Sequence, residues 1–408
     1  MLAVRVQGAG PIAPFDEGAG ALPVLGRTLR EVQDEALAAA GFTLGDDLSR
    51  PRLVFGEGTF FTASLLRKLR KNGQTGRLRV RDERWLRMAS PLASDPERPR
   101  VGFVNTGEPA TLEGLGDLEF DLGLQASPPA TVHPAFAHVV AEGGVVCGPA
   151  IAHDIEHWVH LVRVNLLGLT SKAAEITEQF TGAPWWWKLG RVAQVLWAAG
   201  WPSEANIHRA VCRVGKGAKI HPTAVVEVSE IGAGAVVGPL AVVRGSVVGA
   251  GATIDAQAHV VASSVGARAQ VGRGAHLALS VLAEGAMVSQ GWGHQASVFG
   301  RDSFVAQGVT TLDLSFGAPI RVSAPAPGGE GGPAGAAERR LSTGTHFLGS
   351  CVGHRAKVGA GVRLGFGMAV PNDALLVAPA RDLARRWPRP VVGAATVEGG
   401  EVVPVRGA

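Results

Sequence analysis

Single aliphatic residues recur at steps of six, six and five positions between Val214 and Phe316, so the pattern repeats every seventeen residues. A helix repeats about every 3.6 residues and an ordinary strand about every two, and neither period fits. Gly commonly follows the aliphatic residue, and Ala commonly lies two places before the next one. The spacing predicts a three-sided solenoid in which each face sends one aliphatic side chain inward per coil. The inward series begins with Val214, Ile220, Val226, Ile231, Val237 and Val243.

The rhythm stops after Phe316 and returns in steps of six at Val352, Val358, Leu364 and Val370. The interruption, residues 317–345, contains a Pro-, Gly- and Ala-rich segment from Ser323 to Ala337 that cannot pack as a coil, and we expect a mobile excursion there. The tail, residues 377–408, loses the rhythm. We expect it either to add a last strand to the open edge of the solenoid or to remain loose.

Before the solenoid, residues 1–150 alternate between strand-like and helix-like segments joined by Gly-rich loops. Strands are expected at Leu2–Val6 and Arg52–Phe55, and helices at Arg27–Ala40 and Ala63–Lys71. The order strand, loop, helix, strand, loop, helix is typical of a parallel sheet with helical crossovers. This part of the chain is therefore predicted to be an α/β domain.

Residues 151–211 show a helical pattern. We expect a helix over about Asp154–Leu167, with His153, His157 and His160 on one of its faces. Imidazoles at this spacing can share a metal ion, but there is no H-E-x-x-H arrangement. The interpretation we favour is a polar helix face packed on the rest of the molecule, and we name no metal ligands.

A second, more apolar helix is expected in the same region, with five Trp between Trp185 and Trp201 and with Lys188 and Arg191 among them. Such a helix can lie on a membrane interface. The interpretation we favour is that these Trp side chains pack between the two domains or at a subunit contact.

The composition narrows the function classes. The chain has 408 residues and a formal net charge of +4, with Lys and Arg scattered along it, which does not indicate a nucleic-acid binder. Its three Cys residues have neither a disulfide pattern nor a metal-type spacing. There is no signal segment and no apolar run of membrane-spanning length, so we expect a cytoplasmic protein without a membrane span.

The N-terminal segment GAGALPVLGRTLREVQDEALAAAGF, Gly18–Phe42, resembles the sugar-phosphate nucleotidyltransferases. LVFGEGTFFTASLLRKL resembles the family's next strand and helix, with Glu57 where the family has the Asp that holds the catalytic Mg²⁺. The first loop supplies Gly8 and Gly10 for nucleotide binding, but the family's Arg does not follow it, and the segment that should carry the phosphate-binding Lys reads GAGAL. The resemblance implies a degenerate domain, with Mg²⁺ as a cofactor only if nucleotidyl transfer is retained.

The solenoid resembles the left-handed parallel β-helix of hexapeptide-repeat acyltransferases and of bifunctional sugar nucleotidyltransferase–acetyltransferases. In that family three solenoids pack as a trimer, acyl-CoA lies between neighbours, and a His acts as general base on the acceptor. The resemblance therefore implies a homotrimer that takes acetyl-CoA or another acyl-CoA as donor. Its further partner would be a sugar phosphate or a nucleotide sugar.

His294 lies where the rhythm expects an inward aliphatic residue, within GWGHQASVFGRDSFVAQGVTTLDLSF. This stretch resembles the segment of the bifunctional enzymes that carries the base for acetyl transfer. The resemblance implies His294 as the catalytic base. The other interpretation is a hydrogen-bonded histidine at a corner of the coil.

Five further residues are candidates for binding substrate or cofactor. His259 and His276 are seventeen residues apart, each directly before an inward aliphatic residue, which predicts two imidazoles stacked on one outer face. That arrangement indicates either a ligand or interface ladder or a solvated face. His354 stands in the closing coils where the family's pattern has Asp, and Arg321 and Lys357 are cations for the phosphates of a nucleotide sugar or of CoA.

The expected fold is an α/β N-terminal domain joined by a helical linker to an all-β left-handed parallel β-helix. The expected boundaries are 1–150 for the degenerate nucleotidyltransferase-like domain, 151–211 for the Trp-rich linker, 212–376 for the β-helix and 377–408 for the tail. The expected function is acyl transfer to a sugar or sugar nucleotide, with nucleotidyl transfer lost. The alternative is a non-catalytic binding or assembly scaffold derived from a sugar nucleotidyltransferase.

Overall fold

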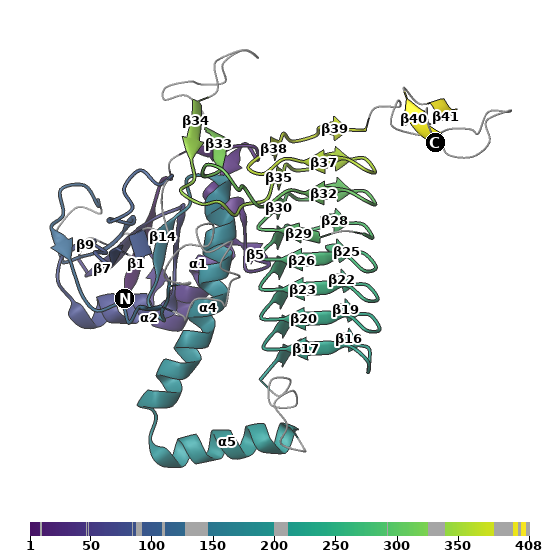
Figure 1. Cartoon of the computed structure of the whole chain (residues 1–408). Helices are drawn as coiled ribbons and strands as arrows, with labels where there is room; N and C mark the ends of the chain where they lie inside the picture. The colour runs from purple at the N-terminus through teal and green to yellow at the C-terminus, as the bar shows by residue number, and fades with distance from the viewer. Residues whose placement is uncertain are drawn as a thin grey trace.

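The computed structural model describes residues 1–8, 10–45, 47, 49–83, 85–86, 92–107, 111–126, 146–199, 211–291, 293–324, 339–378, 395–398 and 401–404. An N-terminal α/β region lies beside a stack of short parallel strands, and two long helices connect them (Figure 1). The predicted fold class, an α/β region followed by a parallel β-solenoid, is confirmed.

A six-stranded sheet forms the centre of the N-terminal region. Its strands are β1 (Leu2–Val6), β6 (Thr43–Leu44), β7 (Arg52–Gly56), β9 (Gly76–Leu78), β10 (Val101–Val104) and β11 (Asp117–Leu118). Their order is β11-β9-β10-β7-β1-β6. β1 pairs in parallel with β6 and β7, as predicted, and β9 pairs in parallel with β11. β10 departs from the prediction, because it runs antiparallel to both of its neighbours.

Four antiparallel strand pairs and a short 3-10 helix, η1 (Ala19–Ala21), surround this sheet. The pairs are β2 (Pro11–Ile12) with β3 (Glu17–Gly18), β4 (Pro23–Val24) with β5 (Arg27–Thr28), β8 (Thr59–Phe61) with β14 (Ala152–Asp154), and β12 (Gln125–Ala126) with β13 (Val146–Cys147).

The first two helices start and stop at local sequence signals. α1 (Leu29–Ala40) begins with a capping box between Thr28 and Glu31 and ends at Gly41, whose φ of 77° is left-handed. α2 (Ala63–Asn72) begins with the Thr62 hydroxyl, which accepts the Leu65 N–H, and ends at Gly73 with φ 66°. Both helices therefore lie where the sequence predicted them.

α4 (Trp158–Gly182) corrects the prediction of a helix over about Asp154–Leu167. The helix begins later because the chain just before it is strand β14, and the His157 side chain caps its first turn by accepting the Val159 N–H at 3.2 Å. The three histidines named above therefore do not share one helix face: one lies on β14, one is the cap and one is helical.

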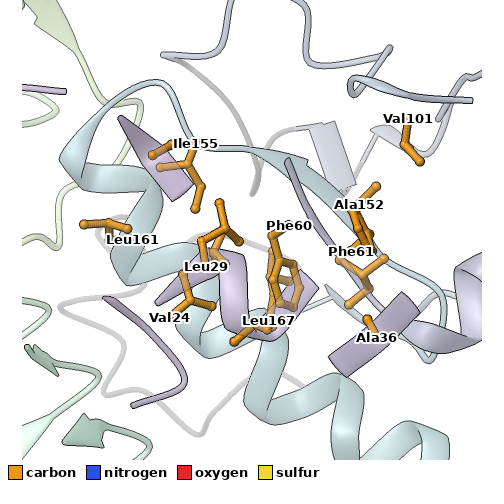
Figure 2. Close-up of a cluster of buried hydrophobic side chains, with 14 of the residues drawn as sticks. Val24, Leu29, Ala36, Phe60, Phe61, Val101, Ala152, Ile155, Leu161 and Leu167 are labelled. Carbon is orange, nitrogen blue, oxygen red and sulfur yellow. The ribbon is translucent and has the colours of Figure 1, made fainter. Parts of the chain in front are cut away.

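The first half of α4 closes the hydrophobic core of the N-terminal region. Figure 2 shows Leu161 and Leu167 of α4 beside Val24, Leu29 and Phe60, and all five side chains are buried. This part of the expected linker thus contributes to the same core as the sheet.

The solenoid has three parallel sheets, one per face. The docking sheet, named because it faces the N-terminal region, contains β15 (Arg213–Val214), β18 (Glu230–Ile231), β21 (Val247–Val248), β24 (Ser264–Val265), β27 (Val281–Leu282), β30 (Val298–Phe299), β35 (Cys351–Val352) and β38 (Ala369–Val370). The outer sheet contains β16 (Lys219–Ile220), β19 (Val236–Val237), β22 (Thr253–Ile254), β25 (Gln270–Val271), β28 (Met287–Val288), β31 (Phe304–Val305), β36 (Lys357–Val358) and β39 (Leu375–Leu376). The histidine sheet contains β17 (Val225–Glu227), β20 (Val242–Arg244), β23 (His259–Val261), β26 (His276–Ala278) and β29 (Gly293–Gln295), with the pair β32 (Thr310–Thr311) and β37 (Arg363–Leu364) continuing that face.

The predicted inward aliphatic residues from Val226 onward form one buried core, which confirms the seventeen-residue coil. At the open first coil Ile220 is partly buried, and Val214 is exposed instead of inward. Gly follows the aliphatic residue because the next coil lies directly above it. A Cβ added at Gly249 would lie 2.5 Å from the backbone nitrogen of Ala267, a separation that no side chain tolerates. This hexapeptide parallel β-helix agrees with the left-handed β-helix expected from the resemblance.

A ladder of buried serines joins the coils where the histidine sheet turns into the docking sheet. Each serine hydroxyl except the last accepts the backbone N–H of the serine in the next coil, at 3.0–3.2 Å, and donates to a carbonyl of its own coil. The members of this serine ladder are Ser229, Ser246, Ser263, Ser280, Ser297 and Ser350. It satisfies backbone donors that the tight corner leaves outside the strand pairing.

The interruption of the solenoid is flanked by an antiparallel hairpin of β33 (Arg321–Ala324) and β34 (Arg339–Ser342). Most of the predicted mobile segment lies outside the described residues. In the tail, β40 (Ala395–Glu398) and β41 (Glu401–Pro404) pair with each other, and within the described part of the chain neither extends a solenoid sheet.

The N-terminal region covers the docking sheet. The outward side chains of Val281, Val298 and Cys351 are fully buried and belong to the same core cluster as the N-terminal sheet. Asn165 of α4 crosses the contact, because its Oδ1 accepts both the Leu25 N–H and the Ser264 hydroxyl at 2.7 Å. One face of the solenoid is thereby occupied by the protein's own N-terminal region.

Candidate functional site

The histidine sheet carries an exposed pair of imidazoles. His259 and His276 are directly paired on neighbouring strands, and both side chains point to solvent. Their ring centroids are 5.8 Å apart with the rings at 69° to each other, an edge-to-face arrangement. The structure thus brings together two of the sequence-predicted residues in the predicted stack.

The same outward column continues beyond the pair. Gly293 follows His276 on the next strand, and a Cβ built on it would lie 3.8 Å from His276 Nδ1, so the glycine leaves space beside that nitrogen. Thr310 occupies the same place one coil later, and it pairs with the exposed Arg363. We call these five residues, from His259 to Arg363, the histidine column.

Sequence reasoning missed the last three members of this column. The signal was present, because Gly293 and Thr310 lie seventeen and thirty-four residues after His276. Arg363 was hidden by the interruption, which breaks the count between β32 and β37.

His294 points into the solenoid. It pairs with Leu277 in the inward column, is 2% exposed, and packs its ring against Phe299 at a centroid distance of 5.2 Å. Burial lowers the pKa of His294 to about 4, and Thr311 Oγ1 lies 3.5 Å from its Nδ1. The contacts of His294 are those of a core side chain, and its ring is out of reach of an acceptor on the outer face.

The predicted N-terminal site residues lie together at the carboxyl end of the parallel strands. Gly8 follows β1 and Glu57 follows β7, and a Cβ built on Gly8 would lie 3.7 Å from Glu57 Cβ. Gly10 lies in the same loop with φ 97°. The Glu57 carboxylate is bound by Arg30 of α1, with 2.5 Å between Oε1 and the guanidinium.

This donor set does not fit Mg²⁺. Mg²⁺ is usually held by one or two carboxylates. Glu57, the carboxylate expected to hold it, already neutralises the Arg30 guanidinium. Among the described residues, no group of three or more His, Cys, Asp or Glu side chains could hold a metal ion.

His354 lies at the contact between the two parts of the molecule rather than on an open face. Its Nδ1 accepts the Arg301 N–H at 2.8 Å, so Nε2 carries the proton and donates to Glu17 Oε1, also at 2.8 Å. Glu17 binds the Arg301 guanidinium as well. Asn372 accepts the His354 N–H and donates to the Phe15 carbonyl. We call these contacts the hairpin latch, because they hold β2–β3 on the last coils.

The two predicted phosphate-binding cations lie apart from the histidine column. Arg321 lies on β33, where its guanidinium donates to the Arg340 carbonyl at 2.8 Å. Lys357 is exposed on the outer sheet, between Phe304 and Leu375 of the neighbouring strands. Neither cation shares a face with His259 and His276.

A buried titratable group that the sequence did not single out is Asp154 on β14. Its carboxylate accepts the Thr59 hydroxyl at 2.5 Å and the Arg100 N–H at 3.0 Å, while burial raises its pKa to about 6. The cavity beside it is about 10 Å³, which is about the space of a single water molecule. Asp154 therefore joins strands and has no room for a substrate.

Two larger hollows lie elsewhere. One of about 390 Å³ opens between the chain after β9 and the chain after β11, with Arg79, Arg81, Asp82, Glu119 and Asp121 on its rim. The other, of about 140 Å³, lies between α1 and the docking sheet. Neither contains a histidine.

No family model and no curated protein matches this chain.

Proposed function

We propose that this protein is an acyltransferase that acts on a sugar or sugar nucleotide at the outer face of the histidine sheet. The observation that supports it best is the histidine column, in which two exposed imidazoles, a glycine, a hydroxyl and a guanidinium follow one another on adjacent coils. The resemblance of the solenoid to hexapeptide acyltransferases supports the same class of reaction.

In the proposed reaction His276 is the general base. The acceptor's amine or hydroxyl attacks the thioester carbonyl of an acyl-CoA, its N–H or O–H bond breaks, and the proton passes to the imidazole. The C–S bond then breaks, and the proton moves on to the departing CoA thiolate. His276 is preferred over His259 because Gly293 leaves space next to its Nδ1.

Arg363 and Thr310 would bind the phosphate of the acceptor. A guanidinium and a hydroxyl are the donors that phosphate recognition uses. Three strand steps separate His276 from Arg363, which is about 14 Å at the usual strand spacing. That length suits a sugar phosphate or the first part of a nucleotide sugar.

His294 has a different role in this proposal from the one expected from the sequence. Because it lies in the inward column of the coil that follows His276, His294 is a core residue that supports this part of the solenoid. Trimeric assembly remains part of the proposal, and it would use the histidine and outer sheets, because the docking sheet is already covered.

The test measures release of free CoA thiol from acetyl-CoA in the presence of amino sugars, sugar phosphates and nucleotide sugars. We expect His276→Ala to lower the turnover by about a hundredfold or more. Arg363→Ala is expected to raise the KM for the phosphorylated acceptor much more than it lowers kcat. The matched control is His221→Ala, because His221 is an exposed histidine on the first coil, away from the column.

Turnover that survives in His276→Ala and His259→Ala would refute the site. Absence of both thiol release and acetyl-CoA binding by calorimetry would refute the reaction class.

The second candidate function is a non-catalytic binding or assembly scaffold. The Glu57–Arg30 ion pair favours it, because an ancestral metal-binding carboxylate would then have become a structural partner. Under this alternative the protein binds neither acyl-CoA nor a uridine triphosphate and sugar-1-phosphate mixture, and His276→Ala changes no measurable ligand affinity.

A further inference from the structure

The described apolar side chains of α5 (Trp185–Ala199) belong to none of the hydrophobic cores formed by the described residues. It follows α4 after a break at Ala183 and Pro184 and runs at the base of the molecule, away from the N-terminal sheet (Figure 1). The sequence-based interpretation placed its Trp side chains between the domains or at a subunit contact. Among the described residues, Trp185, Trp186 and Trp197 are exposed and belong to neither core, and Trp201 lies outside the described residues.

Most of the exposed apolar residues of α5, all those described except Trp187, gather on one side of the helix. Successive residues of a helix are turned by about 100° around its axis. Viewed down the axis of α5, these side chains fall within an arc of roughly 140° that has Val192 at one end and Trp197 at the other. The members of this arc, with their exposed fractions, are Trp185 at 72%, Trp186 at 62%, Leu189 at 60%, Val192 at 43% and Trp197 at 87%. We call this surface the tryptophan face.

The opposite side of α5 is polar and positively charged. Lys188, Arg191 and Gln194 lie there, and the chain contains no Asp or Glu between Glu178 and Glu204. Trp187 also lies on that side, where its ring contacts Phe180 and the Arg191 guanidinium at centroid distances of 6.4 and 5.9 Å. The helix is therefore amphipathic, with cations as its only charges.

More cations lie at the neighbouring end of the solenoid. The first coil, with β16 and β17, is the coil nearest to α5 in Figure 1. Lys216 and Lys219 of this coil are exposed, and neither forms an ion pair within the described residues. The base of the molecule thus presents a tryptophan face together with unpaired positive charges.

We propose that α5 binds the surface of an anionic lipid bilayer, with the tryptophan face in the headgroup region and the cations of α5 and of the first coil on acidic headgroups. Trp is the side chain that prefers the membrane interface, because its ring is apolar and its N–H still reaches water or headgroups. A helix with an aromatic face and only basic charges lies in the interface plane. Among the described residues, no helix has the length and apolar character of a membrane span.

The charges favour a lipid surface over a second copy of this chain. A second α5 helix would offer no opposite charge to Lys188, Arg191 or the exposed lysines of the first coil, because α5 contains no Asp or Glu. Acidic headgroups supply the missing opposite charge, at about 1 kcal/mol per cation near the surface.

The experiment is cosedimentation of the full chain with vesicles of phosphatidylcholine alone or of phosphatidylcholine and phosphatidylglycerol in equal parts. We expect binding to the anionic vesicles, weakened by added salt, and little binding to the neutral ones. Replacing Trp185→Ser, Trp186→Ser and Trp197→Ser together is expected to weaken binding at least about tenfold. The matched control is Trp187→Ser, from the polar side, which should change binding by less than about twofold.

Equal binding to both kinds of vesicle, or none to either, would overturn the proposal. So would a triple variant that binds as the unaltered chain does. If light scattering instead shows a dimer that the triple variant loses, while vesicle binding is absent, the tryptophan face is an interface between copies. Circular dichroism of each variant checks that the fold is retained, and acetyl-CoA turnover is not needed for any of these readouts.

Discussion

At the scale of single residues, the same side chain has different chemistry on the two sides of a solenoid strand. His276 and His294 lie one coil apart in neighbouring columns of the same sheet, one outward and one inward. The inward imidazole loses its water and its pKa falls to about 4, so it is neutral throughout the neutral range. The period of two along each strand decides which histidine is available for chemistry.

His294→Leu is predicted to stabilise the protein most at acid pH. The unfolded chain binds a proton at His294 below about pH 6.5, whereas the folded chain resists protonation until about pH 4. The unaltered protein therefore loses stability as the pH falls from about 6.5 to about 4, by roughly 3 kcal/mol if this group acts alone. Leu occupies the equivalent inward place in the preceding coil and cannot titrate.

Urea unfolding of both proteins from pH 4 to pH 8 measures this difference. Asp154, whose pKa burial raises from 3.8 to about 6, adds stability to the folded protein as the pH falls between these two pKa values. This contribution is equal in both proteins and cancels in the difference. A difference between the two curves that does not change with pH would contradict the placement of His294.

The sequence predicted the position of single side chains correctly where they follow the seventeen-residue repeat. The stacking of His259 and His276 follows from their spacing of seventeen, and the structure confirms it. Glu17 could not be linked to His354 in this way, because 337 positions separate them and only the docking of two separate units brings them together.

At the scale of elements, the aliphatic rhythm predicted the coils but not what holds their corners. The serine ladder recurs every seventeen residues like the core positions, yet a pattern built on apolar residues passes over it. The late start of α4 was missed for another reason. The spacing of its histidines suggests one helical face, whereas β14 pairs with β8 and places His153, the first of these histidines, in a strand.

Ser263→Ala is predicted to destabilise the solenoid by about 1–3 kcal/mol, because the buried Ser280 N–H loses its acceptor at 3.0 Å. Guanidinium unfolding followed by far-ultraviolet circular dichroism measures the change. Gln270→Ala, an exposed substitution on the outer sheet, serves as the control and should alter stability by less than about 0.5 kcal/mol. A ladder variant as stable as this control would show that another donor or water takes over.

At the scale of the whole molecule, the N-terminal region and the solenoid form one body through contacts along the docking sheet. Lys172 of α4 binds Glu230 at 2.8 Å near the first coils, and the hairpin latch binds at the last ones. The fold class could be predicted from the sequence because each part has its own hydrophobic pattern. The solenoid repeats every seventeen residues, and the N-terminal region alternates between strand and helix patterns. Their docking could not, since it depends on residues that no local pattern marks.

Glu17→Ala is predicted to release the β2–β3 hairpin without unfolding either part. Burial acts to raise the pKa of Glu17, but hydrogen bonds and charge from His354 and Arg301 outweigh it, so the pKa is lowered. The latch therefore contributes stability above the unfolded carboxyl's pKa of about 4.5, and loses it as the pH falls through the lower folded value.

Hydrogen exchange of the full chain measures this release. Backbone amides of residues 11–18 should exchange faster in Glu17→Ala at neutral pH, while those of the central coils remain protected. Glu35→Ala, which removes an exposed partner of Arg27, is the matched control. Unchanged exchange in residues 11–18 would mean that Asn372 and Phe15 hold the hairpin by themselves.

The docked region also sets the number of coils. A free solenoid can gain or lose a seventeen-residue coil without harm, because each coil contacts only its neighbours. Here the distance from Glu230 to His354 must match the distance from Lys172 to Glu17. Losing one coil would bring Glu230 and His354 closer together by about 4.8 Å. A hydrogen bond cannot lengthen by that much. The N-terminal region, which does not repeat, therefore fixes the number of coils between these two contacts.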